Sequence, residues 1–265
     1  VQAAQRHGVE VRPVDVSHSD RDCTLEDLPR EPAVRLGLNR VGGLSRAAAD
    51  RIAAARRDAP FQDAEDLARR AGLDRRELQA LAAADALIGL SGHRRLQMWD
   101  AAGHRAPPAL LRQAPVHEAP IELPPAPEGE AIVWDYAATR LTLRRHPLAL
   151  LRPQLRARRL MTAEELKALP DKRFARACGI VTVRQQPQTA NGTIFVSLED
   201  ETGAVQVIVW RHVRERQRAE LLHARLLAVH GVWQREGPLC NLIAGRLEDL
   251  TPLLGRLATE SRDFH

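Results

Sequence analysis

The feature that most constrains the fold of this chain is a predicted β-hairpin, the segment FVSLEDETGAVQVIVW from Phe195 to Trp210. Two runs in which apolar and polar residues alternate flank an acidic turn that ends in Gly203. This pattern is typical of two antiparallel strands joined by a short connection. Because further strand-like runs lie on both sides, we predict that the hairpin is the middle of a five-stranded barrel.

The same alternation places the other strands. The predicted strands are Phe174–Arg184, Thr193–Glu199, Ala204–Trp210, Leu226–Gln234 and Leu239–Leu247, with a helix over Val213–Leu222. Gly237 supplies the positive φ that a tight turn between the last two strands needs. This arrangement predicts an OB-type β-barrel over residues 171–250, a fold that binds oligonucleotides.

Several barrel residues are candidates for contact with a nucleic-acid strand. In the second strand we expect Ile194, Val196 and Leu198 to face the core, and Thr193, Phe195 and Ser197 to face outward. An outward Phe195 could stack on a base, an interaction of about 1–3 kcal/mol. Trp210 and Trp233 either stack in this way or close the core. The loop from Val183 to Gly192 adds polar donors, unless it is a flexible loop with no ligand; its candidates are Arg184, Gln185, Thr189 and Asn191.

A helical region precedes the barrel. From Ala33 to Ala102 apolar residues recur at steps of three and four, which predicts short helices. Asp74 with Glu77, and Thr162 with Glu165, are predicted capping boxes. Seven prolines between residues 106 and 127 remove backbone donors and favour extended geometry, so this segment is a predicted linker.

The segment RLGLNRVGGLSRAAADRI, residues 35–52, resembles a helix-hairpin-helix motif. In that motif a sharp bend directs amide N–H groups at a helix N-terminus toward a phosphate of duplex DNA. A second, weaker copy spans residues 71–87, where Asp74 would repel a phosphate. Two helical hairpins that merely pack against each other are the alternative. The candidate DNA-binding residues are Gly42, Gly43, Ser45 and Arg46 in the first copy and Gly72, Arg75 and Arg76 in the second.

These patterns predict an α+β multidomain protein in which an all-α tandem helix-hairpin-helix unit is followed by a five-stranded OB-type β-barrel. The predicted parts are the end of an upstream domain (1–30), the helix-hairpin-helix domain (31–105), a proline-rich linker (106–127), a mixed helical connector (128–170), the barrel (171–250) and a C-terminal tail (251–265).

Composition limits the classes of function. A formal net charge of +5 favours polyanionic partners, although a solvated basic surface would give the same balance. Three widely spaced cysteines predict neither a disulfide framework nor a metal knuckle, which favours a reducing, cytoplasmic setting. We find no membrane-spanning run or secretory signal in the sequence. The first residue, Val1, suggests a fragment of a longer protein.

Catalytic signals are weak. Asp20 and Asp22 form a D-x-D pair that could bind Mg²⁺, but without a third carboxylate in a strand a polar turn is the better interpretation. The sequence contains no P-loop and no G-x-S-x-G motif. We therefore predict no catalytic residues, no metal site and no cofactor in this chain.

The order of parts resembles the C-terminal region of bacterial C-family DNA polymerases, the family of the DNA polymerase III alpha subunit. Particular strings resemble its error-prone, damage-induced branch: HGVEVRPVDVSHSDRDCTLE (7–26), RLGLNRVGGL (35–44), HPLALLRPQL (146–155), VRQQPQTANG (183–192), FVSLEDETG (195–203) and SRDFH (261–265). The resemblance covers essentially the whole chain.

The resemblance implies a parent enzyme that extends primers across damaged template, with other mutagenesis proteins as partners. Its metal-binding carboxylates, and hence its Mg²⁺, lie in a palm upstream of this chain, so this chain alone would not polymerise. It would grip duplex DNA through Gly42, Gly43 and Ser45 and guide single-stranded template with the barrel. Alternative functions are a protein-interaction platform for mutagenesis partners and an RNA- or tRNA-binding OB module.

Overall fold

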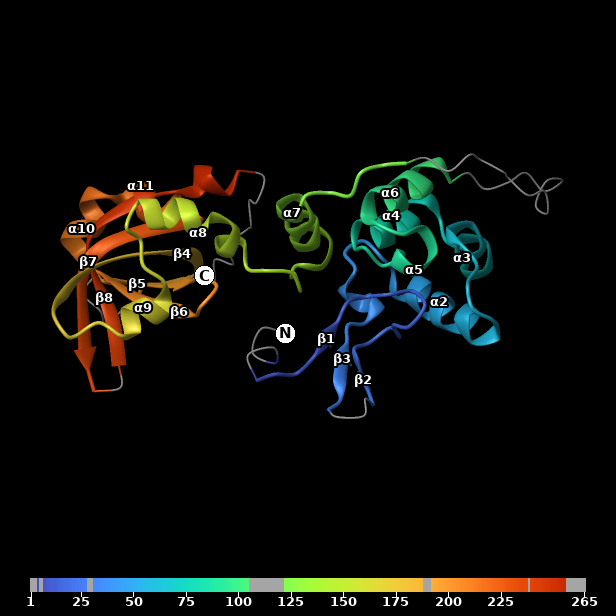
Figure 1. Ribbon diagram of the computed structural model, residues 1–265, viewed down its shortest axis with the longest axis horizontal. Helices are drawn as coiled ribbons and strands as arrows, with labels where there is room; N and C mark the ends of the chain where they lie inside the picture. Colours follow the sequence, from blue (N-terminus) through green and yellow to red (C-terminus); the bar gives the residue numbers. More distant parts are fainter. Residues whose placement is uncertain are drawn as a thin grey trace. The chain divides into compact units, whose positions relative to one another are not determined.

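The computed structural model describes residues 4, 7–27, 31–104, 122–187, 192–237 and 239–255. It divides into two compact units, Val1–Leu143 and Arg144–His265. Figure 1 labels their helices and strands in chain order. The first unit is mainly helical, and the second contains the barrel.

The first unit begins with a small three-stranded sheet. Its strands are β1 (Val11–Arg12), β2 (Thr24–Glu26) and β3 (Ala33–Arg35), and β3 lies in the middle, parallel to β1 and antiparallel to β2. Val14 and Val16 are buried in the same apolar core as the helices that follow. The structure therefore shows no boundary at residue 30, where we predicted one, because these valines complete the helical core.

Six α-helices and a 3₁₀ turn make up the rest of this unit in the described residues. They are η1 (Leu38–Arg40), α2 (Arg46–Asp58), α3 (Ala64–Ala71), α4 (Arg75–Ala83), α5 (Ile88–Ser91), α6 (Arg94–Gly103) and α7 (Glu128–Thr139). The predicted capping box of Asp74 and Glu77 is confirmed at the start of α4. Ile52, Leu67 and Leu81 lie fully buried between the helices, so the predicted period of three and four residues does mark the core face.

Helix α7 belongs to this first unit, although we predicted it as part of a connector. The buried Arg94 of α6 donates a hydrogen bond to the Ala131 carbonyl at 2.9 Å and another to the Asp135 carboxylate. A buried guanidinium needs such partners. The pairing fixes α7 against α6, and the predicted connector is split at Leu143.

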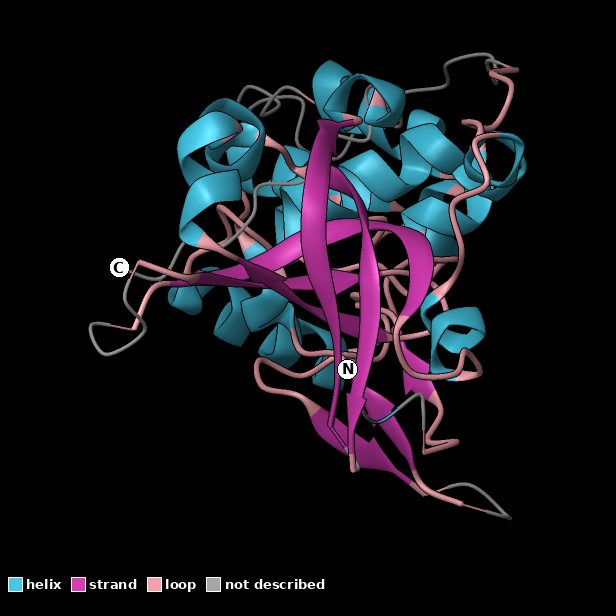
Figure 2. Ribbon diagram, turned by 90° about the vertical axis from the view of Figure 1, so that its left-hand side faces the viewer, coloured by secondary structure: helices cyan, strands magenta, loops and turns pink. Residues whose placement is uncertain are grey.

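The second unit is a closed five-stranded barrel with the order β4-β5-β6-β8-β7, as predicted for an OB-type fold. Its strands, strongly curved in Figure 2, are β4 (Arg173–Gln185), β5 (Ile194–Glu199), β6 (Ala204–Val209), β7 (Leu226–Glu236) and β8 (Leu239–Asp249). The helical elements are α8 (Pro147–Ala157), α9 (Ala163–Lys167), α10 (Arg211–Arg216), α11 (Arg218–His223) and η3 (Thr251–Leu254). The predicted capping box of Thr162 and Glu165 starts α9.

Alternation in β5 follows the prediction, with Ile194, Val196 and Leu198 buried and Phe195 partly exposed. Thr193 is an exception: we expected it to face outward, but it is buried. It precedes the first residue of β5, so the period of two does not extend to it. Trp233 is 2% exposed and closes the barrel core.

The acidic turn between β5 and β6 is anchored by an arginine from α8. Arg152 donates from Nε and Nη2 to the two carboxylate oxygens of Glu201, at 2.5 and 2.7 Å. Asp200 accepts hydrogen bonds from the amides of Ala163, at the start of α9, and of Gly203, within the turn. The acidic residues are therefore structural: they fix both helices to the rim of the barrel.

Candidate nucleic-acid interface

The first predicted DNA contact is the bend between η1 and α2. Gly43 has φ +86°, a left-handed conformation that favours glycine. Gly43, Ser45 and Arg46 are exposed. Ser45 caps α2, because its hydroxyl accepts a hydrogen bond from the Ala48 amide at 3.0 Å.

Four amides at this bend have no acceptor within the part of the chain that the structure describes: those of Gly43, Ser45, Arg46 and Ala47. They lie at or just before the start of a 13-residue helix, whose dipole places partial positive charge there. Unpaired amides at a helix N-terminus bind anions such as phosphate. This bend is therefore suited to a phosphate.

Gly42 has a different role from the one we predicted. Its amide donates to the Ala138 carbonyl of α7 at 2.7 Å, so it is not available to a phosphate. A Cβ atom at this position would lie 3.0 Å from the same oxygen. Because Gly42 has no side chain, α7 can approach the bend closely and accept its hydrogen bond.

Charged side chains around the bend differ in how they are paired. The Glu77 carboxylate accepts hydrogen bonds from Ser45 Oγ at 3.0 Å and from Arg51 Nη2 at 3.2 Å. A hydrogen bond from Arg21 lowers the pKa of Asp22, which keeps that carboxylate ionised and paired. Arg46 is exposed and forms no ion pair with any described residue, and the same is true of Arg40.

A cavity of about 340 Å³ opens beside the bend. Its lining residues are Arg21, Asp22, Leu38, Asn39, Leu44, Ser45, Arg46 and Ala49. Two arginines, Arg21 and Arg46, and one carboxylate, Asp22, line this cavity, so its lining carries more positive than negative charge.

Most backbone amides of the second hairpin have acceptors within the chain, but those of Arg75 and Arg76 have none among the described residues. The amides of Gly72 and Leu73 donate to the Ala68 carbonyl, and the Asp74 amide donates to Glu77. Arg51 of α2 donates to the Ala71 carbonyl at 2.7 Å and thereby ties the two hairpins together. This geometry matches the alternative in which the hairpins pack against each other.

The remaining candidates of this copy lie in the first turn of α4. The arginines at positions 75 and 76 are exposed and form no ion pair with a described residue. However, the carboxylate of Asp74 caps the same helix end. A phosphate there would meet a negative charge.

The predicted barrel loop is also different. Arg184 Nε donates to the Leu221 carbonyl at 2.7 Å, and its Nη2 donates to the Ala224 carbonyl. It holds the end of α11, so we correct its predicted role as a phosphate contact. Gln185 is exposed at the end of β4 and pairs across the sheet with the partly exposed Phe195. The candidates at positions 189 and 191 lie outside the described residues.

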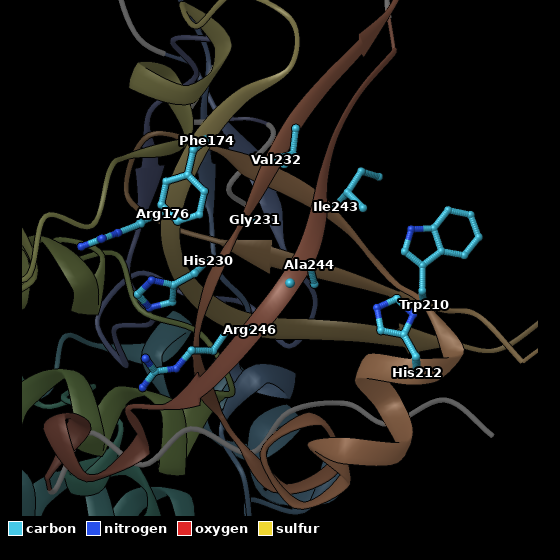
Figure 3. Close-up of a pocket in the computed structure, with 11 residues that line it drawn as sticks. Phe174, Arg176, Trp210, His212, His230, Gly231, Val232, Ile243, Ala244 and Arg246 are labelled. Carbon is cyan, nitrogen blue, oxygen red and sulfur yellow. The ribbon is translucent and has the colours of Figure 1, made fainter.

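Trp210 lies on a surface that the sequence did not reveal. It is 46% exposed and does not close the core. It borders a cavity of about 500 Å³ that β4, β7 and β8 also line (Figure 3). β4 is far from β7 and β8 in the sequence, so only strand pairing brings its outward residues beside theirs. The available signal was the outward alternation of Phe174 with Arg176 and of His230 with Val232.

The two carboxylates of the D-x-D pair, Asp20 and Asp22, form ion pairs with arginines. Asp20 Oδ1 lies 2.6 Å from Arg56 Nη2, and Asp22 Oδ2 lies 2.8 Å from Arg21 Nη2. Among the described residues no group of three or more His, Cys, Asp or Glu side chains could hold a metal ion. Within the same part of the chain, no helix has both the length and the apolar character needed to cross a membrane.

Two family models match the chain. Residues 8–97 match one described as a helix-hairpin-helix motif. Residues 175–249 match one described as an OB-fold nucleic acid binding domain. The predicted fold class is thereby confirmed, with a helix-hairpin-helix region before a closed barrel.

Curated relatives match along the whole chain. The error-prone DNA polymerase of Ralstonia nicotianae is 54% identical over 272 residues, which is 100% of this chain and 25% of that protein. The error-prone DNA polymerase of Azoarcus sp. is 55% identical over 271 residues, 100% of this chain and 26% of that protein. The chain thus spans about a quarter of the length of these relatives, and the predicted resemblance to error-prone polymerases is confirmed.

Solved structures are less similar. Asparaginyl-tRNA synthetase from Pyrococcus horikoshii matches 34% of this chain and 23% of its own, with 22% identity and a TM-score of 0.30. The Stn1-ten1 complex of S. pombe matches 32% of this chain and 63% of its own, with 16% identity and a TM-score of 0.26. Matches at these scores carry no argument about function.

Proposed function

We propose that this chain is a non-catalytic, DNA-binding C-terminal region of an error-prone DNA polymerase used in damage-induced, translesion synthesis. In this proposal the bend before α2 holds a phosphate of duplex DNA, and the barrel holds single-stranded template. The parent would be a nucleotidyltransferase whose metal-binding carboxylates and Mg²⁺ lie outside this chain. The similarity of the whole chain to error-prone polymerases supports this assignment.

One observation carries the proposal: the exposed bend with four amides that have no described acceptor and two unpaired arginines. Such a site binds the backbone rather than the bases, so it contributes affinity without sequence preference. A polymerase that moves along its template needs this kind of contact. The paired state of Glu77 and Asp22 leaves no free carboxylate among the described residues lining the bend.

The test compares two matched double variants in a titration with labelled primed duplex. Arg40→Ala with Arg46→Ala removes two exposed cations at the first hairpin. Arg75→Ala with Arg76→Ala removes the same charge at the second hairpin. We expect the first pair to weaken duplex binding about tenfold or more, because hydrogen bonds and charge act together on one phosphate. The second pair should change it much less.

Equal losses for the two double variants would contradict the assignment of the phosphate to the first bend. The wild-type chain failing to bind primed duplex at low salt would contradict the proposed function as a whole. Circular dichroism of each variant checks that the fold is intact.

A further inference from the structure

The outer face of the barrel carries a row of basic side chains across three strands. Arg176 of β4 pairs with His230 of β7, and His230 pairs with Arg246 of β8. Burial and the neighbouring Arg176 guanidinium lower the pKa of His230, which favours its neutral form. The two arginines therefore supply the positive charge of this row.

A row of apolar side chains runs parallel to the basic row. Phe174 of β4 pairs with Val232 of β7, and Val232 pairs with Ile243 of β8. On β4 and β7 the two rows are two residues apart, and two residues in a strand span about 7 Å. Phe174 is 62% exposed, and Val232 is 42% exposed. Large apolar side chains left in water in this way mark a binding surface more often than scattered ones do.

Both rows line the cavity of about 500 Å³ that Trp210 borders. Figure 3 shows Phe174, Arg176, His230 and Arg246 following one another on the left of the view, with Trp210 on the right. Arg176 lies over the Phe174 ring, with its guanidinium carbon 5.6 Å from the ring centre. The cavity thus has an aromatic ring on two sides, and both arginines lie on the same side as Phe174 in this view.

Acidic groups do not neutralise this surface. Among the described residues, Glu248 has a carboxylate in contact with this surface. Its oxygens lie 3.3 Å from Arg158 Nη1 and 3.6 Å from His230 Nε2. Arg176 and Arg246 have no carboxylate partner in the described part of the chain. Unpaired arginines beside exposed aromatic rings are the pattern of a single-strand binding groove.

We propose that this outer face of β4, β7 and β8 is the barrel's single-stranded DNA site, with bases stacked on Phe174 and Trp210 and phosphates held by Arg176 and Arg246. The inference rests on the proposed function and locates its single-strand contact away from Phe195 and Arg184. The separation of about 7 Å between the rows lets the base and the phosphate of one nucleotide contact both.

Several observations favour a single strand over other occupants. Bases in a duplex are already stacked on each other, so exposed rings gain nothing from them. A protein partner would need carboxylates for the arginines and apolar side chains for the rings. A single strand supplies a phosphate and a ring at every nucleotide, so it fits alternating rows of both kinds.

The test uses the full chain and measures binding of a labelled oligo-dT by fluorescence anisotropy, with primed duplex measured in parallel. Phe174→Ala and Trp210→Ala are each expected to weaken oligo-dT binding at least about fivefold, the lower limit for loss of one stacking ring. Arg176→Ala with Arg246→Ala should weaken it further and reduce its salt dependence. Trp210→Phe, which keeps a ring, should retain most of the affinity.

Matched controls separate this face from the rest of the barrel. Phe195→Ala removes the aromatic ring that we predicted from the sequence to stack on a base. Lys167→Ala with Arg218→Ala removes two exposed cations outside the cavity. Each control is expected to change oligo-dT affinity less than about twofold, the range for surface changes away from a site. The variants of Phe174 and Trp210, and the double variant of Arg176 and Arg246, should leave duplex binding at the α2 bend unchanged.

Two results are distinguishable. If Phe195→Ala costs as much as Phe174→Ala, or if the groove variants bind oligo-dT like the wild type, the inference is overturned while duplex binding and the proposed function stand. If the wild-type chain binds neither DNA, the proposed function itself fails. Thermal unfolding of every variant shows whether a loss of binding reflects a loss of fold.

Discussion

At the residue scale, arginines in this protein serve two purposes. Arg152 and Arg184 are partly or wholly buried and donate to acceptors within the chain. Arg46 and Arg246 are exposed and form no ion pair with a described residue. Only the exposed arginines without an ion-pair partner are available to a polyanion. For this reason we no longer count Arg184 among the DNA-binding residues.

The buried pair of Arg152 and Glu201 yields a stability prediction. Replacing Arg152 with Met leaves a largely buried carboxylate without its partner, so the free energy of unfolding should fall by about 3 kcal/mol. Urea denaturation of the full chain measures this. Arg156→Met, on the exposed face of the same helix, is the control and should cost less than about 0.5 kcal/mol. Equal effects would contradict the structural role of Arg152.

The same pair predicts a pH dependence. Burial alone would raise the pKa of Glu201, but the hydrogen bond from Arg152 lowers it overall. A carboxyl with a lowered folded pKa stabilises the fold above its unfolded pKa, about 4.3, and that stability is lost as the pH falls through the folded pKa. The stability difference between wild type and Arg152→Met should therefore shrink below about pH 4. A difference that grows on acidification would contradict this sign.

Cysteine reactivity provides another test at this scale. Burial raises the pKa of the Cys178 thiol to about 12, whereas Cys23 is exposed. Because the thiolate is the reactive form, iodoacetamide at about pH 8 should label Cys23 and leave Cys178 unmodified until the chain is denatured. Peptide mass spectrometry over time distinguishes the two sites. Rapid labelling of Cys178 in the native protein would show that the barrel is more open than described.

At the element scale, the barrel strands were predictable and the helices beside them were less so. The strand predicted over Ala204–Trp210 is observed as Ala204–Val209, because alternation of period two fixes its limits. The helix predicted over Val213–Leu222 is instead two helices that meet at Gln217. The side chain of Gln217 donates to the Leu247 carbonyl and accepts from the Leu247 amide. This break depends on β8, thirty residues away, so no local pattern indicates it.

The candidate site shows the same limit. The bend at Gly43 could be predicted, because glycines before a capped amphipathic helix are a local signal. The hydrogen bond from Gly42 to Ala138 could not, since α7 lies far along the chain. The rows on the barrel face likewise depend on the register of three strands, which the sequence pattern does not specify.

One glycine in that face makes a prediction about strand packing. A Cβ atom on Gly231 would lie 1.9 Å from the Ile243 carbonyl oxygen, so β7 and β8 would have to separate. Gly231→Ala should lower the free energy of unfolding by about 3 kcal/mol. Gly245→Ala, where the nearest atom is 3.5 Å from the added carbon, is the matched control. Thermal unfolding that gives equal midpoints for the two variants would contradict the close approach of these strands.

At the scale of the whole molecule, each compact unit has a surface suited to DNA backbone. In the first unit this is the bend before α2, and in the second it is the outer face of β4, β7 and β8. The net charge of +5 is modest, so local arrangement matters more than total charge. The boundary between the units falls after Leu143 rather than in the predicted linker, because Arg94 holds α7 in the first unit.

The salt dependence of primed-duplex binding tests the central claim most directly, namely that phosphate contacts hold the DNA. Titrations of the wild-type chain between about 50 and 200 mM salt should give a linear fall of log K with log salt concentration, with a slope of about −0.9 for each phosphate contacted. Arg40→Ala with Arg46→Ala should make that slope shallower by about 1, because both arginines are proposed to act on the same phosphate. Binding that does not change with salt, or a slope that this double variant leaves unaltered, would contradict the account.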